Sequence, residues 1–196
     1  MVNMNIQDIR TLKILEAIDG SELPSQRDMA QALDVSLGLI NSFIRRMAKK
    51  GYFKISHLPR NRIRYILTPK GAAEKTRLTY TYIQLSLQFY KDARQKFRQC
   101  LKDLECQGVR NVAFFGAGDM AEIGCLSLKE TNLKLVAIAD SKRCGEMLFD
   151  MSIVEPEALN RFEIDRIIIT ATDQSPTEAT ALLTENNIPA AAILVL

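Results

Sequence analysis

One segment of the sequence has the residue types and spacing of a phosphate-binding loop. Residues 116–121 read Gly-Ala-Gly-Asp-Met-Ala and directly follow the predicted strand 111–115. A G-x-G-x-x-A loop between a strand and a helix allows a tight turn, lets a phosphate approach the backbone, and places that phosphate at a positive helix end. The pattern predicts a site for a nucleotide-type ligand, with these cofactor-binding residues: Gly116, Ala117, Gly118, Asp119 and Met120.

Two further residues are expected near this loop because each ends a predicted strand. Asp140 follows the strand 133–139, 22 residues after Gly118, where an acid would take the ribose hydroxyls of NAD(H). Thr170 ends the strand 165–170, at the sheet edge where ligands bind. Lys142 and Arg143 could instead face the diphosphate of a nucleotide sugar. The ligand is therefore expected to be NAD(H) or a nucleotide sugar.

The charge distribution points to a second kind of binding in the first half of the chain. Residues 1–110 carry 20 Lys and Arg against 10 Asp and Glu, whereas residues 111–196 carry 6 against 13. No acidic residue occurs between Asp34 and Glu74. This asymmetry predicts that the first half meets a polyanion, although a solvated basic face would show the same composition.

The elements that carry these basic residues have the order of a winged helix. Helices are predicted over 6–18, 25–33 and 36–50, followed by strands over 52–55 and 62–67. Two helices joined by a short turn, the second presenting small polar residues and Arg, are typical of a helix-turn-helix. We expect Ser36, Asn41 and Ser42 to face base edges, and Arg45, Arg46, Arg60 and Arg62 to contact phosphates or a groove.

The same stretch resembles a known family of regulators. The runs SQRDMAQALDVSLGLINSFIRRMAKKGYF and RYILTPKG are similar to the MarR-type winged-helix regulators. The resemblance implies double-stranded DNA as the partner of residues 1–70, taken as the DNA-binding domain. A winged helix can also serve protein contacts, and the acid-free stretch is the independent reason to prefer DNA.

Residues 71–108 are predicted to form one long connecting helix. Ile83, Tyr90, Phe97 and Leu104 recur every seven residues, which favours pairing with a second copy and hence a homodimer. The alternative is that this helix packs against both domains of its own chain.

Residues 109–196 are predicted to form a Rossmann-like nucleotide-binding domain, an α/β fold with a five-stranded parallel sheet. The remaining strands are expected at 153–154 and 188–196, with helices at 155–160 and 174–186. The runs NVAFFGAGDMAEI, LVAIADS, SIVEPEAL, DRIIITAT and NNIPAAAILVL are similar to Rex and CoA-binding domains and to the front domain of PglD-type sugar acyltransferases.

The two resemblances together imply a dimeric transcription regulator with the layout of a Rex-type redox repressor. The first half is closer to MarR proteins associated with exopolysaccharide clusters, which implies polysaccharide biosynthesis genes as targets. A different function remains open, in which the α/β domain binds no small molecule and docks on another protein.

Several other classes of function are disfavoured by what the sequence lacks. The four cysteines form no C-x-x-C pair and His57 is the only histidine, so neither a zinc site nor histidine-based catalysis after residue 57 is expected. Cys144 could be a redox thiol only if its pKa were lowered. The longest apolar run, 188–196, is too short to span a membrane, and a cytoplasmic protein without enzymatic activity is expected.

Overall fold

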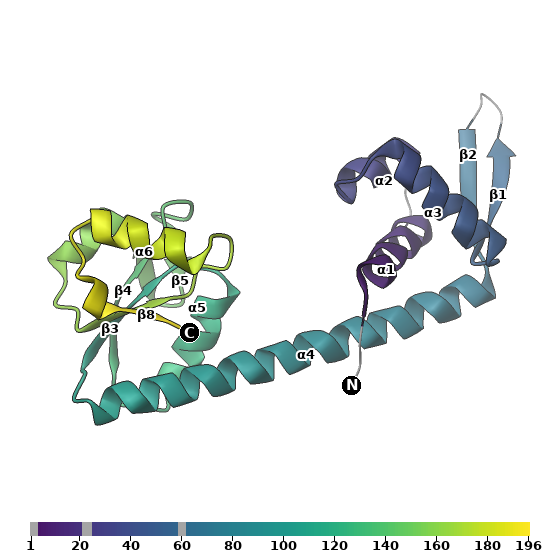
Figure 1. Cartoon of the computed structure of the whole chain (residues 1–196). Coiled ribbons are helices and arrows are strands. Elements are labelled where there is room, and N and C mark those ends of the chain that lie inside the picture. The colour runs from purple at the N-terminus through teal and green to yellow at the C-terminus, as the bar shows by residue number, and fades with distance from the viewer. Residues whose placement is uncertain (1–3, 21–24, 59–61) are drawn as a thin grey trace. The chain divides into compact units, whose positions relative to one another are not determined.

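The computed structural model describes residues 4–20, 25–58 and 62–196, and the chain forms two compact units, residues 1–88 and 89–196 (Figure 1). Helix α4, from Pro69 to Cys106, is shared between them. Each unit has its own hydrophobic core. In the described part of the chain, no helix is long and apolar enough to cross a membrane.

The first unit begins with three helices, α1 (Ile6–Asp19), α2 (Gln26–Ala32) and α3 (Leu37–Lys49). A side chain caps each helix at its N-terminus. Ser25 and Asp28 form a capping box at α2, and Ser36 accepts a hydrogen bond from the Leu39 amide at α3. These caps confirm the predicted starts of the second and third helices.

A hairpin follows, made of β1 (Phe53–Leu58) and β2 (Arg62–Leu67) in antiparallel register from Phe53–Leu67 to Leu58–Arg62. The Thr68 hydroxyl accepts a hydrogen bond from the Gly71 amide at 3.1 Å, and α4 begins at Pro69, two residues before the predicted start of the connecting helix at residue 71. The core of this unit holds α3 against α1 and β2 through side chains that are at most 7 % exposed: Leu12, Leu15, Ile40, Phe43, Ile44, Met47 and Tyr65.

The second unit contains a six-stranded sheet in the order β5-β6-β4-β3-β7-β8. Its strands are β3 (Asn111–Phe115), β4 (Lys134–Ala139), β5 (Met147–Leu148), β6 (Met151–Val154), β7 (Arg166–Ile169) and β8 (Ile193–Val195). The five predicted strands are parallel, but β5 pairs antiparallel with β6, so the prediction of a purely parallel five-stranded sheet was wrong. A two-residue strand is too short to produce an alternating pattern in the sequence.

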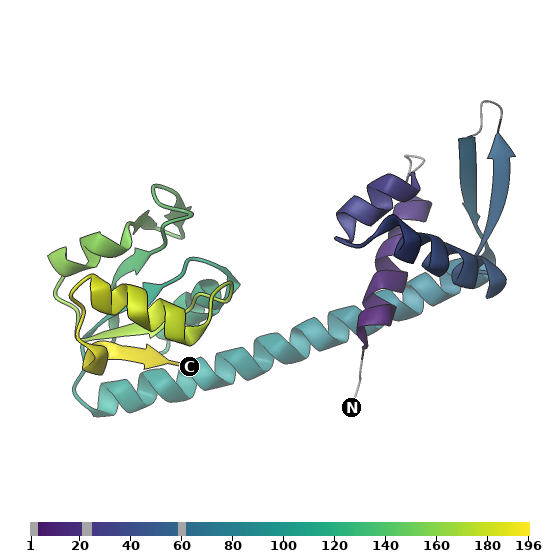
Figure 2. The same cartoon turned by 45° about the horizontal axis from the view of Figure 1, so that its top comes forward.

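Helices cover both faces of this sheet (Figure 2). Val112 and Phe114 of β3 pack toward α5 (Asp119–Leu128) and toward Phe97 of α4. Their neighbours Ala113 and Phe115 point to the opposite face, which is covered by the 3-10 helix η1 (Pro156–Arg161) and by α6 (Pro176–Glu185). The second half of α4 is therefore one of the layers of this unit.

The last strand is shorter than the sequence suggested. Residues 188–196 were expected to be extended, but Ala190–Ala192 form a 3-10 turn after Pro189 and only Ile193–Val195 pair with β7. A run of three alanines and a proline is apolar without being a good strand former, which explains the error.

Candidate functional site

Helix α3 presents one apolar face to the core and one polar face to solvent. Ile40, Phe43, Ile44 and Met47 are buried, as the sequence predicted. With 3.6 residues per turn, the opposite side of the helix carries Gly38, Ser42, Arg45 and Lys49, all of which are exposed. This outer stripe of α3 is therefore open to solvent.

The predicted DNA-binding residues of α3 do not all lie in the outer stripe. Ser36 caps the helix, and Asn41 is half-buried on its flank. Arg46 turns toward α1, where it donates a hydrogen bond from Nη1 to Oε1 of Gln7 at 3.2 Å. Its guanidinium carbon also lies 4.8 Å from the centre of the Phe43 ring, so the Arg46 side chain lies beside the outer stripe, between α3 and α1.

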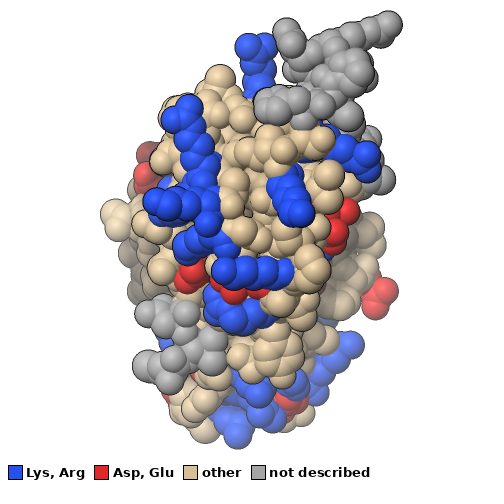
Figure 3. Space-filling view, turned by 90° about the vertical axis from the view of Figure 1, so that its right-hand side faces the viewer, with Lys and Arg blue, Asp and Glu red and all other residues tan. Residues whose placement is uncertain are grey.

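Basic side chains gather on the face of the winged-helix unit shown in Figure 3, with few acidic groups among them. None of the ion pairs between described residues involves Arg45 or Lys49. In the hairpin, Arg64 is exposed on β2. Arg60 lies outside the described residues, and for Arg62 only the backbone at the start of β2 is described.

The ligand loop, residues 116–120, connects β3 to α5, and its two glycines differ in what surrounds them. Gly116 has a φ of +106°, and a Cβ placed there would lie 2.5 Å from Cα of Ala171. Gly118 is the N-cap of α5, and a Cβ there would meet no atom within 4 Å. The fold thus requires glycine at position 116, whereas position 118 faces open space at a helix N-terminus.

Asp140 reaches this loop from the end of β4. Its Oδ2 accepts a hydrogen bond from the amide of Ala117 at 2.9 Å, and its Oδ1 accepts one from the amide of Lys142 at 2.9 Å. The structure therefore brings Asp140 and the ligand loop together, as predicted. Each carboxylate oxygen can accept two hydrogen bonds, and these two amides give one bond to each oxygen of Asp140.

Two basic residues after Asp140 are engaged within the chain. Arg143 donates to the carbonyl of Ala117 and, from Nε, to Glu146 at 2.8 Å. Lys142 pairs with Asp173, which raises the pKa of Lys142 and lowers that of Asp173 through their hydrogen bond. Sequence reasoning missed Asp173, because only the order of β4, β3 and β7 in the sheet reveals that the two loops face each other.

The other residues near the ligand loop differ in their surroundings. Thr170 is buried, and its hydroxyl lies 2.6 Å from the carbonyl oxygen of Gly116. Met120 is half-buried against the core, while Asp119 is exposed at the first turn of α5. A hydrogen bond with Glu155 raises the pKa of the exposed Cys144 thiol, which disfavours a reactive thiolate at that position.

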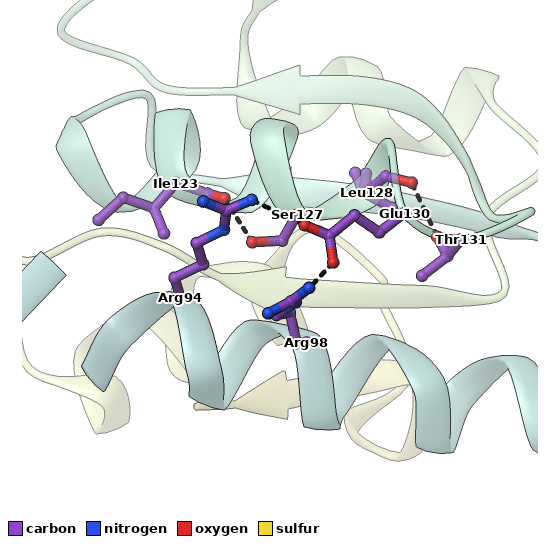
Figure 4. A network of polar contacts seen from close by, with 7 residues as sticks. All are labelled: Arg94, Arg98, Ile123, Ser127, Leu128, Glu130 and Thr131. Carbon is purple, nitrogen blue, oxygen red and sulfur yellow. Dashed lines mark hydrogen bonds and ion pairs between the residues drawn. The ribbon is translucent and has the colours of Figure 1, made fainter. Parts of the chain in front are cut away.

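A polar network joins the end of α5 to α4 (Figure 4). Glu130 accepts hydrogen bonds from Arg94 at 2.7 Å and from Arg98 at 2.5 Å, and these bonds lower its pKa. Close to this network, Phe97 and Phe114 pack beneath Gly124 of α5. Helix α5 thus touches the ligand loop at one end and α4 at the other.

The two ends of the apolar stripe of α4 differ in burial. Phe97, Leu101 and Leu104 are at most 2 % exposed in the core of the second unit, which confirms packing within the same chain for this part. Ile83 and Leu87, in contrast, are 48 % and 55 % exposed. Only the first part of the predicted pairing stripe is therefore available to a second copy.

Comparison with known families identifies two parts of the chain. Residues 7–54 match the model described as winged helix-turn-helix DNA-binding. Residues 108–193 match a model described as C2185-like, N-terminal, and each match covers less than half of the chain. The expected relation to Rex and CoA-binding domains stays a prediction. Comparison with curated proteins gave no match.

Solved structures share only distant similarity with this chain. MepR, a transcription regulator of the Staphylococcus aureus multidrug efflux pump MepA, is 16% identical, with 54% of this chain and 80% of MepR covered and a TM-score of 0.40. The mitomycin 7-O-methyltransferase MmcR is 9% identical, with 95% and 73% covered and a TM-score of 0.36. Similarities this weak carry no argument. The family match together with α1–α3 and the hairpin shows that the first unit is a winged helix-turn-helix domain.

Proposed function

We propose that the chain is a transcription regulator whose winged-helix domain, residues 1–70, binds double-stranded DNA. The observation that carries the proposal is the outer stripe of α3, where Arg45 and Lys49 are exposed, share no ion pair within the described ranges, and lie in a stretch without acidic residues. Unpaired cations on a helix that can enter a major groove attract phosphates.

The roles of individual residues follow from their positions. Ser42 and Arg45 would face base edges, with Gly38 allowing the backbone to approach closely, and Lys49 would contact phosphates. Arg46, held against Phe43 and Gln7, would contact the DNA backbone beside the helix. Arg60 and Arg62 are assigned to the tip of the wing, while Ser36 and Asn41 would act at the edge of the interface.

The DNA-binding proposal is tested by selecting preferred sites from random DNA with the full chain. We expect a recurrent sequence whose binding survives higher salt than that of random fragments. Arg45→Ala, which removes the group placed on base edges, should relax the preference at one position, whereas Lys49→Ala should weaken binding to all sequences alike. Equal retention of every DNA fragment would contradict the proposal.

The α/β domain, residues 109–196, is proposed to bind a nucleotide-type effector, NAD(H) or a nucleotide sugar, at the ligand loop. Support comes from the open space at Gly118, the N-terminus of α5 behind it, and Asp140 at the end of β4. The parallel strands, in the order 3-2-1-4-5 by sequence, place this loop at the carboxyl edge beside the point where strand order reverses.

A thermal-shift panel of NAD⁺, NADH, CoA and UDP-sugars tests whether the α/β domain binds an effector. Stabilisation by one compound, lost in Gly118→Val, is expected for a sensor. The internal bonds of Asp140, Arg143 and Thr170 favour the alternative, a module that docks on another protein and binds no small molecule. No shift with any compound would support that alternative.

We further propose that the regulator is a homodimer without catalytic activity, and that α4, residues 71–108, connects effector and DNA. Two helix-turn-helix units are needed to cover two half-sites about 34 Å apart. Since α5 joins the ligand loop to α4 through Glu130, an effector that binds two arrangements of α5 unequally would shift α4.

A further inference from the structure

The first turn of α3 exposes two leucines at the end of the helix where a helix-turn-helix contacts base edges. Leu37 and Leu39 are 45 % and 38 % exposed. Neither side chain belongs to the core of the first unit, which α3 joins through other residues that begin at Ile40. The apolar surface of both leucines is therefore available to a ligand of this helix.

The two leucines flank the glycine that lies between them. At about 100° per residue, Gly38 lies in the outer stripe, and Leu37 and Leu39 project to either side of it. A Cβ at Gly38 would meet no atom within 4 Å, so the backbone there faces open space. Asn41 and Ser42 follow one turn later, and their Cβ atoms tilt back toward the helix N-terminus. We call this opening between the leucines the Gly38 gap.

The chemistry of the first turn is apolar, whereas the rest of the outer stripe is polar. Residues 37–39 carry no polar side chain, and the hydroxyl of Ser36 before them caps the helix by accepting the Leu39 amide. The cations of the outer stripe, Arg45 and Lys49, come about two and three turns later. Among the bases in a major groove, thymine presents an apolar group, its C5-methyl, which contacts apolar side chains. An apolar first turn therefore matches thymine.

We infer that the first turn of α3 reads thymine through its C5-methyl group, which enters the Gly38 gap between Leu37 and Leu39. The surroundings of the gap favour DNA as the occupant over an apolar protein surface. Arg45 and Lys49 share no ion pair within the described ranges and lie in a stretch without acidic residues. The inference rests on the proposed DNA binding and adds the base that the first turn selects.

Replacing thymine by deoxyuridine tests the inference, because it removes the C5-methyl group and keeps every hydrogen-bonding group of the base. The probe is the duplex that the full chain selects from random DNA, with its thymines replaced one at a time and Kd measured by fluorescence anisotropy. Burial of one methyl group corresponds to about three- to four-fold in affinity, so at least one replacement should raise Kd by that factor. A selected duplex in which no replacement raises Kd two-fold would overturn the inference while DNA binding stands.

Alanine variants assign the methyl contact to the leucines. Leu37→Ala with Leu39→Ala removes both sides of the gap, so the effect of deoxyuridine on Kd should fall below two-fold. Leu126→Ala is the matched control, because Leu126 lies in α5 of the second unit and is 36 % exposed. This control should keep the full effect, and circular dichroism checks that the variants remain folded. A double variant as sensitive to deoxyuridine as the wild type would overturn the inference.

Gly38→Ala separates the DNA contact from the stability of the fold. Alanine favours a helix more than glycine does, and the added methyl group meets no atom of the chain within 4 Å, so the urea midpoint should stay the same or rise. The same methyl group fills the gap, so Kd for the thymine duplex should rise at least three-fold and the preference for thymine over deoxyuridine should be lost. A Gly38→Ala variant that keeps this preference would overturn the inference. A full chain that selects no DNA sequence would overturn the proposed function and this inference together.

Discussion

The two glycines of the ligand loop allow a sharp test, because the structure assigns them opposite roles. In Gly116→Ala the new residue must adopt a φ of +106°, which costs an L-residue about 1–2 kcal/mol. Its Cβ would also lie 2.5 Å from Cα and 2.8 Å from Cβ of the half-buried Ala171, and overpacking of this kind costs about 1–3 kcal/mol. We therefore expect Gly116→Ala to destabilise the second unit by about 2–5 kcal/mol.

Gly118→Ala is the matched control for stability and the test variant for binding. Its φ of −85° and ψ of −166° suit alanine, and no atom lies within 4 Å of the added methyl group. Replacing a glycine N-cap by alanine should cost below about 1 kcal/mol. The methyl group would nevertheless project into the space where a phosphate approaches, so the thermal shift caused by an effector should shrink.

Urea denaturation of the full chain and hydrogen exchange of peptides covering β3 measure how much stability Gly116→Ala and Gly118→Ala each lose. Hydrogen exchange reports the second unit alone, which matters because the two units have separate cores. Equal stability of Gly116→Ala and Gly118→Ala would refute the reasoning about the close approach to Ala171.

Three further predictions concern packing, pH and thiol chemistry. Phe97→Ala should destabilise the second unit by about 3–5 kcal/mol in urea denaturation, since Phe97 is fully buried between α4 and the sheet; a loss below 1 kcal/mol would show that α4 is not part of this core. Glu130→Gln should lower the melting temperature at pH 7. The hydrogen bonds from Arg94 and Arg98 lower the pKa of Glu130, so its carboxylate stabilises the fold above the ordinary pKa of 4.5, and this stabilisation is lost as the carboxylate is protonated at lower pH. The difference in melting temperature from the wild type should therefore vanish as the pH falls below 4.5, and a difference that persists at pH 3 would contradict this. Alkylation of Cys144, followed by peptide mass spectrometry, should reach half its maximal rate only above pH 9, because Glu155 raises the thiol pKa; rapid alkylation at pH 7 would argue for a redox role.

Much of the first unit could be predicted from the sequence because its signals are local. A cap and an apolar stripe define the second and third helices, which begin after Ser25 and Ser36, where the predicted ranges start. The orientation of Arg46 could not be predicted in this way. Its contact with Gln7 depends on where α1 packs, which is a tertiary property without a signal along α3.

In the second unit, the ligand loop and Asp140 were found from their spacing after two buried strands. The pair formed by Lys142 and Asp173 was not, because it depends on sheet order and joins loops 31 residues apart in sequence. The apolar stripe of α4 shows that periodicity alone does not predict which surface a helix packs against. A seven-residue repeat looks alike whether the partner is the chain's own sheet, as for Phe97, or a second copy, as in the proposed homodimer.

The claim on which the account depends is that the outer stripe of α3 binds DNA, and the salt dependence of binding tests it most directly. Fluorescence anisotropy with the selected DNA site gives the slope of log Kd against log salt concentration for the wild type, Lys49→Ala and a control on the second unit, Lys134→Ala. We predict that Lys49→Ala weakens binding and reduces the slope by about one, while Lys134→Ala changes neither. Identical slopes for Lys49→Ala and the wild type, or the same reduction in Lys134→Ala, would contradict the account.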